Sequence, residues 1–382
     1  MTGNSVIAIA KKEFFDQLIS RKFLLILGIL LVVAVIGILN GISEYDKSVS
    51  SYNNLQQSVS GTDGQVPLVD LLMKQKPSVL LVFYQMGMVF EVIGGILGIA
   101  MGFDLVTKEK ESKSLKILLA HPVYRDQVIN GKILGGIAAI VLALGCTMAM
   151  SLAILLLFGI VPDLSELLPI LVFCAATFLL IFSFFAIAIL MSTLCEESGR
   201  SLVYTLIIFV ILGSFIPTLI TSPLVMEKVI GPAPEMPEMV TGPTENLADS
   251  ADQAAEAERI QKQNMEAWER FNQQSQEYGE KQMRWADTRD LFSPTNNYAK
   301  ISAFMTNPRM MSQMLYGTMG MTSGGMNEEE QDIMVSVMSQ KIVDLDVYGI
   351  LAMLTGNIIA LMVLPAVFFG LAYVSFMRMD IR

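Results

Sequence analysis

Six apolar runs constrain this sequence more than any other feature. Each run is long enough to cross a bilayer, which takes about 20 residues in an α-helix. Because hydrocarbon offers a backbone amide no hydrogen-bond partner, each run must be helical. We therefore predict an all-α fold: a six-helix transmembrane bundle with an amphipathic N-terminal interfacial helix and a mainly helical domain outside the membrane. The predicted spans cover residues 24–42, 79–103, 133–161, 169–194, 202–221 and 349–376.

The charged residues divide the chain into three parts. Residues 1–222 contain the first five spans and a cytoplasmic loop at 104–132, and residues 349–382 contain the last span and a short tail. Residues 223–348 contain twenty acidic and ten basic side chains, whereas the rest of the chain has sixteen of each, so the whole net charge of −10 lies in this segment. We interpret it as an extracytoplasmic domain. No basic face stands out, which argues against nucleic acid as a partner.

Basic residues in short loops predict the orientation of the spans, because such loops carry more Lys and Arg on the cytoplasmic side. They lie in the N-terminus, the 104–132 loop and the tail: Lys11, Lys12, Arg21, Lys22; Lys108, Lys110, Lys113, Lys116, Arg125, Lys132; Arg378 and Arg382. Alternating spans place all three segments on one side. We predict a multi-pass protein of a prokaryotic cytoplasmic membrane with both termini in the cytoplasm.

The segment before the first span has helical periodicity. Its apolar face is predicted to hold Ile7, Ala10, Phe14 and Leu18, and its polar face Lys12, Glu13, Asp16 and Ser20. This pattern is typical of an interfacial helix, here on the inner leaflet. The alternative is a cytosolic extension of the first span.

The predicted outer domain begins with an irregular linker, because prolines interrupt helices. Residues 245–290 then lack proline, and their large apolar residues follow helical spacing: Ile260, Trp268, Phe271, Tyr278 and Trp285. We predict a long amphipathic helix of about 65 Å, followed by a shorter helix at 328–339.

A methionine-rich stretch at 305–326 separates these two helices. Its thioethers could bind Cu(I), but neither His nor Cys joins the stretch. A flexible apolar surface is the favoured interpretation.

Motifs for catalysis, metal binding and nucleotide binding are missing. The only histidine is His121, so neither a Ser-His pair nor a histidine metal site can form. The only Gly-Lys pair is Gly131-Lys132, and a phosphate-binding loop would need Gly in place of Asp126 and Ser or Thr in place of Ile133. We predict no catalytic, cofactor-binding or metal site. The three cysteines lie in or beside apolar runs and are interpreted as buried thiols.

Glu91 is the one ionisable residue near the middle of a predicted span. A charge there costs about 2.5–3.5 kcal/mol, so the carboxylate must be paired, protonated or functional. Asn357 and Thr355 in the last span are its expected hydrogen-bond partners. A structural role and a place on the translocation path, shared with Asn357, remain equally open.

Three glycines follow Glu91 on the same span and are spaced four residues apart. Gly94, Gly98 and Gly102 form a small-residue face that permits close helix packing. We expect this packing to lie within the chain, with a dimer contact as the alternative.

The cytoplasmic loop has the most specific pattern in the chain, DLVTKEKESKSLKILLAHPVYRDQVINGKILGG. This stretch resembles the signature of type-2 ATP-binding-cassette (ABC) exporter permeases. The matching positions are an acidic-basic pair, a group of leucines, a Pro-x-x-Arg step and a Gly-Lys pair entering the third span: Glu109 and Lys110; Leu115, Leu118 and Leu119; Pro122 and Arg125; Gly131 and Lys132. Lys113 and Ser114 stand where the family usually has Gly and Thr.

The resemblance extends to the order of the six spans, the FSPTNNYAKIS segment and the tail, and the subgroup with a large outer domain fits best. It implies a non-catalytic permease that exports a substrate, paired with a second permease chain, identical or paralogous. A separate ABC ATPase dimer would bind ATP and Mg²⁺ and dock on the loop. The implied coupling residues are Glu109, Lys110, Ser114, Leu115, Leu119, Pro122, Arg125, Gly131 and Lys132.

Within this coupling segment, Pro122 would end a helix over 113–121 and Arg125 would pair with a carboxylate on the ATPase. The alternative is an ordinary charged cytosolic loop.

Two other classes of function stay open. An ion-coupled secondary transporter normally needs several charged groups inside its spans, and one is thin support. A non-transporting scaffold or signalling protein would instead act through the outer domain, by binding an extracytoplasmic protein. Membrane lipid is an expected partner in every case. The sequence does not identify the substrate.

Overall fold

The computed structural model describes residues 2–60, 77–113, 124–238, 240, 250–307 and 347–379, and these contain helices but no strand. The chain forms two compact units. Unit 1 comprises Met1–Ile216, Asp290–Pro308 and Leu345–Arg382, and unit 2 comprises Pro217–Arg289 and Arg309–Asp344.

Six helices of the described chain are long and apolar enough to cross a membrane, which confirms the predicted all-α bundle. They are α2 (Arg21–Ser60), α4 (Leu80–Gly102), α7 (Arg125–Leu157), α8 (Leu164–Leu194), α9 (Ser198–Val210) and α17 (Thr355–Arg378). The fifth span continues from α9 through a π-helical turn, η1 (Ile211–Phe215), into α10 (Ile216–Ile220).

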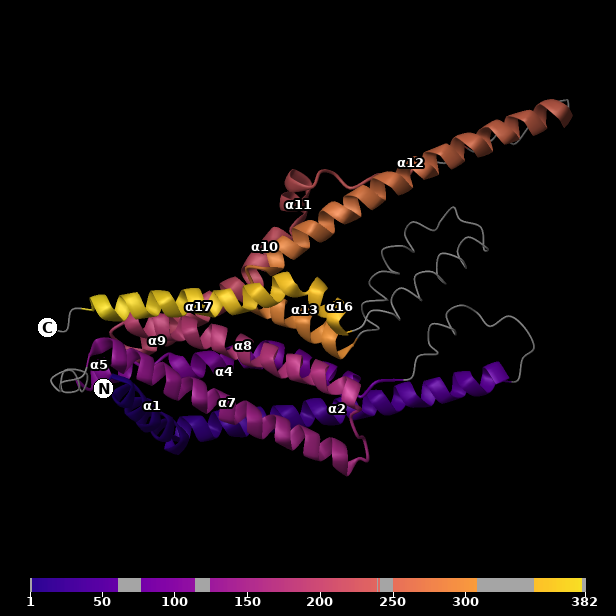
Figure 1. The fold of residues 1–382 in the computed structure, drawn as a ribbon. Helices are drawn as coiled ribbons and strands as arrows, with labels where there is room; N and C mark the ends of the chain where they lie inside the picture. The colour runs from indigo at the N-terminus through magenta and orange to yellow at the C-terminus, as the bar shows by residue number, and fades with distance from the viewer. Residues whose placement is uncertain are drawn as a thin grey trace. The chain divides into compact units, whose positions relative to one another are not determined.

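Helix α8 lies at the centre of unit 1 (Figure 1). It packs most extensively against α4 and α17 and also contacts α9 and α7, while α2 packs on α4. Residues from Phe184 to Ala188 are fully buried, so α8 forms the core.

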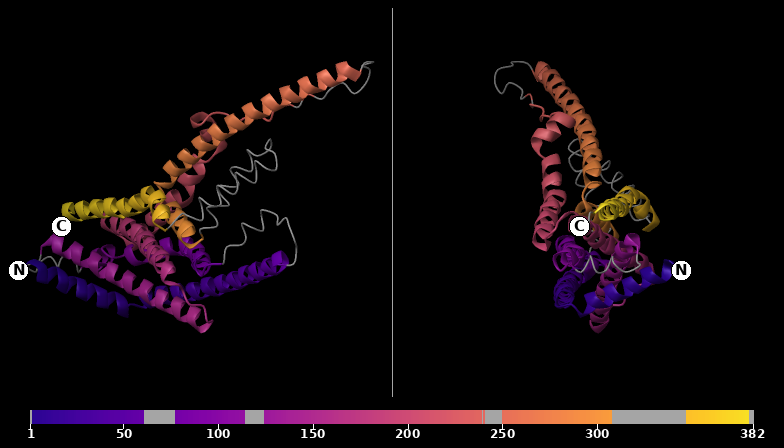
Figure 2. Two further views of the ribbon diagram at one scale, coloured as in Figure 1. Left: turned by 45° about the vertical axis from the view of Figure 1, so that its right-hand side comes forward. Right: turned by 90° about the vertical axis from the view of Figure 1, so that its left-hand side faces the viewer.

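The two chain ends of unit 1 lie on the same side of the bundle. Helix α1 (Thr2–Ile19) begins at one end of the bundle, and α17 finishes at the same end, as the termini in Figure 1 and in the left view of Figure 2 show. Helix α5 (Thr107–Glu111) also lies at this end. We call this the α5 end. The opposite end holds α13 (Pro294–Thr306) and α16 (Val347–Met353), and we call it the α13 end.

Local sequence signals explain several helix boundaries. Ser20 separates α1 from α2, because its hydroxyl accepts a hydrogen bond from the Phe23 amide at 3.1 Å and caps the new helix. Asp163 and Glu166 form a capping box at the start of α8. Helix α7 ends at Leu157, two residues before Gly159, whose φ of +73° suits glycine.

The glycine face of α4 lies against α8. A Cβ atom added at Gly98 would collide with the Ile181 carbonyl oxygen, and one at Gly102 would lie 2.8 Å from the Phe185 carbonyl oxygen. Gly94 faces the side chain of Leu180. The three glycines therefore allow the two helices of one chain to approach closely.

Helix α13 belongs to unit 1 although the sequence division groups it with the outer domain. Ser293 caps its start and Pro294 occupies its first turn. The helix packs against α4, α8 and α17, and Tyr298 and Ile301 are buried there. Burial of these side chains explains why the segment packs in unit 1.

Helix α1 packs along α7, and Ala10 and Phe14 of the predicted apolar face lie against Gly135, but two assignments to the faces are wrong. Ile7, assigned to the apolar face, is exposed, whereas Glu13, assigned to the polar face, turns toward α7. The physical reason lies on α7: Gly131 and Gly135 leave space for the α1 backbone, and the buried ammonium of Lys132 attracts Glu13.

Unit 2 contains α11 (Pro223–Val229) and most of α12 (Ser250–Asp290), the predicted long helix, which has 41 residues. The Trp268 and Phe271 rings pack edge to face at 5.5 Å. The Asn264 side chain bonds both backbone groups of Val240, at 3.0 and 3.1 Å. The predicted helix at 328–339 and most of the methionine-rich stretch lie outside the described residues.

Candidate coupling site at the α5 end

Three consecutive residues of α5 reach three different parts of the bundle. Successive side chains of an α-helix point about 100° apart. Glu109, Lys110 and Glu111 therefore diverge, and each finds a partner on another element.

Lys110 holds the end of α8. Its ammonium donates to the carbonyl oxygens of Thr193 at 2.7 Å and Cys195 at 2.8 Å. The last carbonyls of a helix have no partner within it, and a nearby cation satisfies them and complements the helix dipole.

Glu111 holds the start of α9. Its carboxylate accepts a hydrogen bond from the Ser198 amide at 2.6 Å, where the positive end of the helix dipole favours a negative charge. At the start of α5, the hydroxyl of Ser192 in α8 accepts hydrogen bonds from the amides of Val106 and Thr107, at 2.9 and 3.0 Å. Helix α5 is thus bonded to both sides of the α8–α9 junction.

Glu109 joins a buried ion cluster with Lys132 and Glu13. The Lys132 ammonium lies 2.7 Å from a Glu109 oxygen and 2.8 Å from a Glu13 oxygen, and the Lys132 side chain is only 2% exposed. The cluster connects α5, α7 and α1, which are separate elements in the sequence. A buried charge is tolerated only when it is paired, so each carboxylate stabilises the lysine.

One oxygen of the cluster remains unpaired. Oε2 of Glu109 is buried, and no hydrogen-bond donor of the described chain reaches it. The cluster holds two carboxylates and one ammonium, so the loss of Lys132 would leave two negative charges side by side.

Two further contacts join the ends of the loop to the bundle. Lys22 of α2 pairs with Asp104 at 2.6 Å and lies over the Phe103 ring. Arg125 donates to the carbonyl oxygen of Met379 at 2.8 Å, just after the end of α17. The guanidinium predicted to meet a carboxylate on an ATPase therefore binds this chain's own C-terminal backbone.

The structure brings together only some of the predicted coupling residues. Glu109, Lys110 and Lys132 lie in the network, and Gly131 lies against Ile9 of α1. Ser114, Leu115, Leu119 and Pro122 lie outside the described residues, as does the predicted helix end at Pro122.

Glu91 and Asn357 are not hydrogen-bonded to each other. The Asn357 amide donates to Asn297 of α13 at 2.8 Å, and the Thr355 hydroxyl donates to the carbonyl oxygens of Leu351 and Ala352 in α16. The expected pairing of Glu91 with these residues is wrong, because α13 supplies a nearer amide for Asn357. Within the described ranges, no hydrogen bond or ion pair to Glu91 is formed.

Several site residues escaped sequence reasoning. Glu13 could have been found by including Val6 and Ile9 in the apolar face of α1, since Glu13 falls between these two residues on the helical circle. Ser192 gave no signal, because a serine in a span is unremarkable. Tyr124 directly precedes α7 and is 70% exposed, and only the structure shows this exposure.

These features define a class: a multi-pass helical membrane protein with an ion-paired network at one end. In the part of the chain that the structure describes, no group of three His, Cys, Asp or Glu side chains could hold a metal. The family model of the ABC-2 family transporter proteins matches residues 7–381. The chain therefore belongs to the ABC-2 transporter family, whose members are membrane subunits of ABC transporters. No curated protein matches it.

Proposed function

We propose that this chain is the permease of an exporter and that a separate ABC ATPase dimer docks on the 104–132 loop. The observation that carries the proposal is the network around α5. Its ion pairs and hydrogen bonds join the loop to α1, α7, α8 and the start of α9. A force applied to the loop would thus reach several spans together.

The coupling follows from two packings of the spans. ATP binding to the partner can shift the permease only if the docked ATPase binds one packing more tightly than the other. Helix α5 suits this role because it bonds both sides of the α8–α9 junction, so its displacement changes the angle between two spans.

ATP and Mg²⁺ belong to the partner in this proposal. Lys132, the only lysine after a glycine, lies within α7 with its ammonium held by two carboxylates. It is therefore not free to bind a phosphate. A second permease chain would enclose the path, and α9 offers exposed apolar residues for it, including Val203 and Ile207.

The orientation belongs to the same proposal: the α5 end faces the cytoplasm and the segment that includes α12 lies outside. In a variant without native cysteines, Ser250→Cys should react with a membrane-impermeant thiol reagent in intact cells, and Ser112→Cys should not. The reverse pattern would overturn the orientation.

Tyr124 provides the sharpest test of docking. Exposed tyrosines often carry much of an interface's free energy, about 2 kcal/mol or more. Tyr124→Ala should therefore raise the dissociation constant of the permease–ATPase complex by about thirtyfold, which is seen as a loss of copurified ATPase. The matched control is Tyr348→Ala, because Tyr348 is 69% exposed but lies in α16 at the α13 end.

The readouts are the amount of ATPase retained on the tagged permease and the ATP hydrolysis that the permease stimulates. Arg125→Ala serves as a second variant, since it frees the end of α17. If Tyr124→Ala and Arg125→Ala both retain normal copurification and stimulation, the loop is not the coupling element and the proposal fails.

A second candidate function is mechanical signalling through unit 2. It is favoured by α12, a helix of 41 residues that is about 60 Å long and could bind an extracytoplasmic protein. Reconstituted vesicles separate the two functions. ATP-dependent accumulation of a labelled substrate supports export, and stimulated hydrolysis without accumulation of any tested lipid, peptide, drug or ion supports signalling.

A further inference from the structure

A surface groove of about 620 Å³ lies between α2 and the end of α7, at the end of the bundle opposite α5. Eight residues line it: Leu39, Ile42, Ser43, Asp46, Lys47, Ser50, Ser51 and Phe158. All eight belong to unit 1, and the groove shares no residue with the α5 network.

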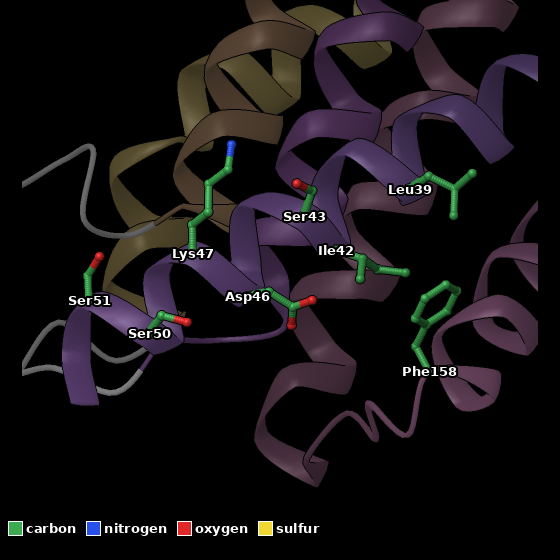
Figure 3. A pocket seen from close by; sticks show the side chains of 8 residues that line it. All are labelled: Leu39, Ile42, Ser43, Asp46, Lys47, Ser50, Ser51 and Phe158. Carbon is green, nitrogen blue, oxygen red and sulfur yellow. The ribbon is translucent and has the colours of Figure 1, made fainter. Parts of the chain in front are cut away.

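The groove is apolar at one end and polar at the other (Figure 3). Leu39 and Ile42 project toward the Phe158 ring, and Asp46 and Ser50 continue the same side of α2. Lys47 projects from a different side of α2, and its ammonium lies 3.6 Å from Glu44. Asp46 is therefore the charged lining residue that faces the apolar end.

The position of Phe158 is well determined by the backbone. The amides of Gly159 and Ile160 bond the carbonyls of Leu156 and Leu155 in a Schellman motif, which ends α7 and holds the turn. Phe158 directly precedes Gly159, so this turn fixes where its ring lies relative to α2.

The surroundings of Phe158 indicate that lipid covers this region. Leu157, Val161 and Leu164 at the α7–α8 turn are all strongly exposed. Such a contiguous apolar surface is covered by a partner or by hydrocarbon. Because α2 and α7 both cross the membrane, lipid acyl chains surround them and can cover this surface. The polar residues of α2 begin at the level where lipid headgroups would lie.

We propose that the groove binds phosphatidylethanolamine. An acyl chain would lie along Leu39, Ile42 and Phe158, and the primary ammonium would pair with the Asp46 carboxylate. A primary ammonium donates hydrogen bonds to a carboxylate, whereas the quaternary ammonium of phosphatidylcholine has no N–H to donate. Phosphatidylglycerol has no cation, and its negative charge would be repelled by Asp46.

Native mass spectrometry of the delipidated full-length chain tests the site. The protein is titrated separately with phosphatidylethanolamine, phosphatidylcholine and phosphatidylglycerol. We expect the ethanolamine lipid to bind most tightly, and Asp46→Asn to weaken it about fivefold, the effect of one charged contact near a membrane surface. Phe158→Ala should weaken all three lipids, because it removes the shared apolar wall.

Two variants serve as matched controls. Phe215→Ala removes an aromatic ring that is 59% exposed, as against 57% for Phe158, but lies outside the groove. Asp16→Asn removes an exposed carboxylate of α1. Both should leave lipid binding unchanged.

Equal binding of the three lipids by the wild-type chain would overturn the proposal, as would an unchanged preference in Asp46→Asn. Occupancy in the membrane is tested by replacing Phe158 with the photoreactive p-benzoylphenylalanine. A crosslinked adduct with the mass of phosphatidylethanolamine supports the proposal, and an adduct with a polypeptide contradicts it. None of these measurements uses the ATPase, so this inference can fail while the proposed exporter function stands.

Discussion

The two ends of the bundle are held together by different chemistry. At the α5 end the contacts are charged, with Lys132 between two carboxylates and Lys110 on the last carbonyls of α8. At the α13 end hydrogen bonds join the helices: the Asn357 amide donates to Asn297, the Thr177 and Tyr298 hydroxyls lie 3.3 Å apart, and the Ser78 hydroxyl donates to the Glu166 carboxylate.

The difference has a mechanical consequence. Breaking a buried ion pair leaves an uncompensated charge, whereas a separated amide or hydroxyl can be satisfied by water. We therefore expect the α5 end to move as one body and the α13 end to separate and re-form. Hydrogen–deuterium exchange should accordingly be slower in α7 near Lys132 than in α13.

Lys132→Met is expected to have the largest effect. It leaves Glu13 and Glu109 buried without their cation, which typically costs about 3–5 kcal/mol. Unfolding of the purified variant, followed by circular dichroism in increasing dodecyl sulfate, measures the loss. Lys12→Met is the control, because Lys12 is exposed on α1.

A triple variant sharpens this prediction. Adding Glu13→Gln and Glu109→Gln to Lys132→Met removes every charge of the cluster, and a fully neutral replacement is often close to neutral in stability. We expect most of the lost stability to return. A triple variant as unstable as Lys132→Met alone would show that packing, rather than charge, holds the cluster.

Gly98→Ala tests the contact between α4 and α8 that links the two ends. Its new methyl group would collide with the Ile181 carbonyl oxygen, and overpacking of this kind costs about 1–3 kcal/mol. Gly145→Ala is the matched control, because no atom lies within 4 Å of a Cβ there. Equal stability of the two variants would contradict the close packing.

Asn357→Ala breaks the neutral contact at the α13 end. It leaves the Asn297 side-chain oxygen without its donor, and the expected cost is about 1–2 kcal/mol. The same unfolding assay measures it, with Thr355→Ala as the control, since that exposed hydroxyl bonds only the carbonyls of Leu351 and Ala352, which are close along the chain. A loss equal to that of Lys132→Met would remove the contrast between the ends.

Glu91→Gln should have the smallest effect on stability, because no hydrogen bond or ion pair within the described part of the chain is lost. Assembly should be unchanged, as judged by size-exclusion chromatography with the ATPase. If transport also persists, Glu91 is a structural group of the bundle. A well-assembled variant that has lost transport would place the carboxylate on the translocation path.

The sequence alone determined the spans, the long helix α12 and the segment that carries the coupling motif. These features are local: hydrophobic run length, helical periodicity and the order of a few motif residues are readable without knowing what lies next to what.

Only the tertiary structure decided how those elements are joined. Lys132 pairs with Glu13 of α1, which lies 119 positions away along the chain. Arg125 donates to the Met379 carbonyl, 254 positions away, and the Asn357 amide donates to the Asn297 side chain, 60 positions away. No local pattern encodes such distances. Glu13 looked like a solvated residue of an amphipathic helix until packing on α7 placed it beside a buried ammonium, and the free energy of pairing that charge explains why it lies there.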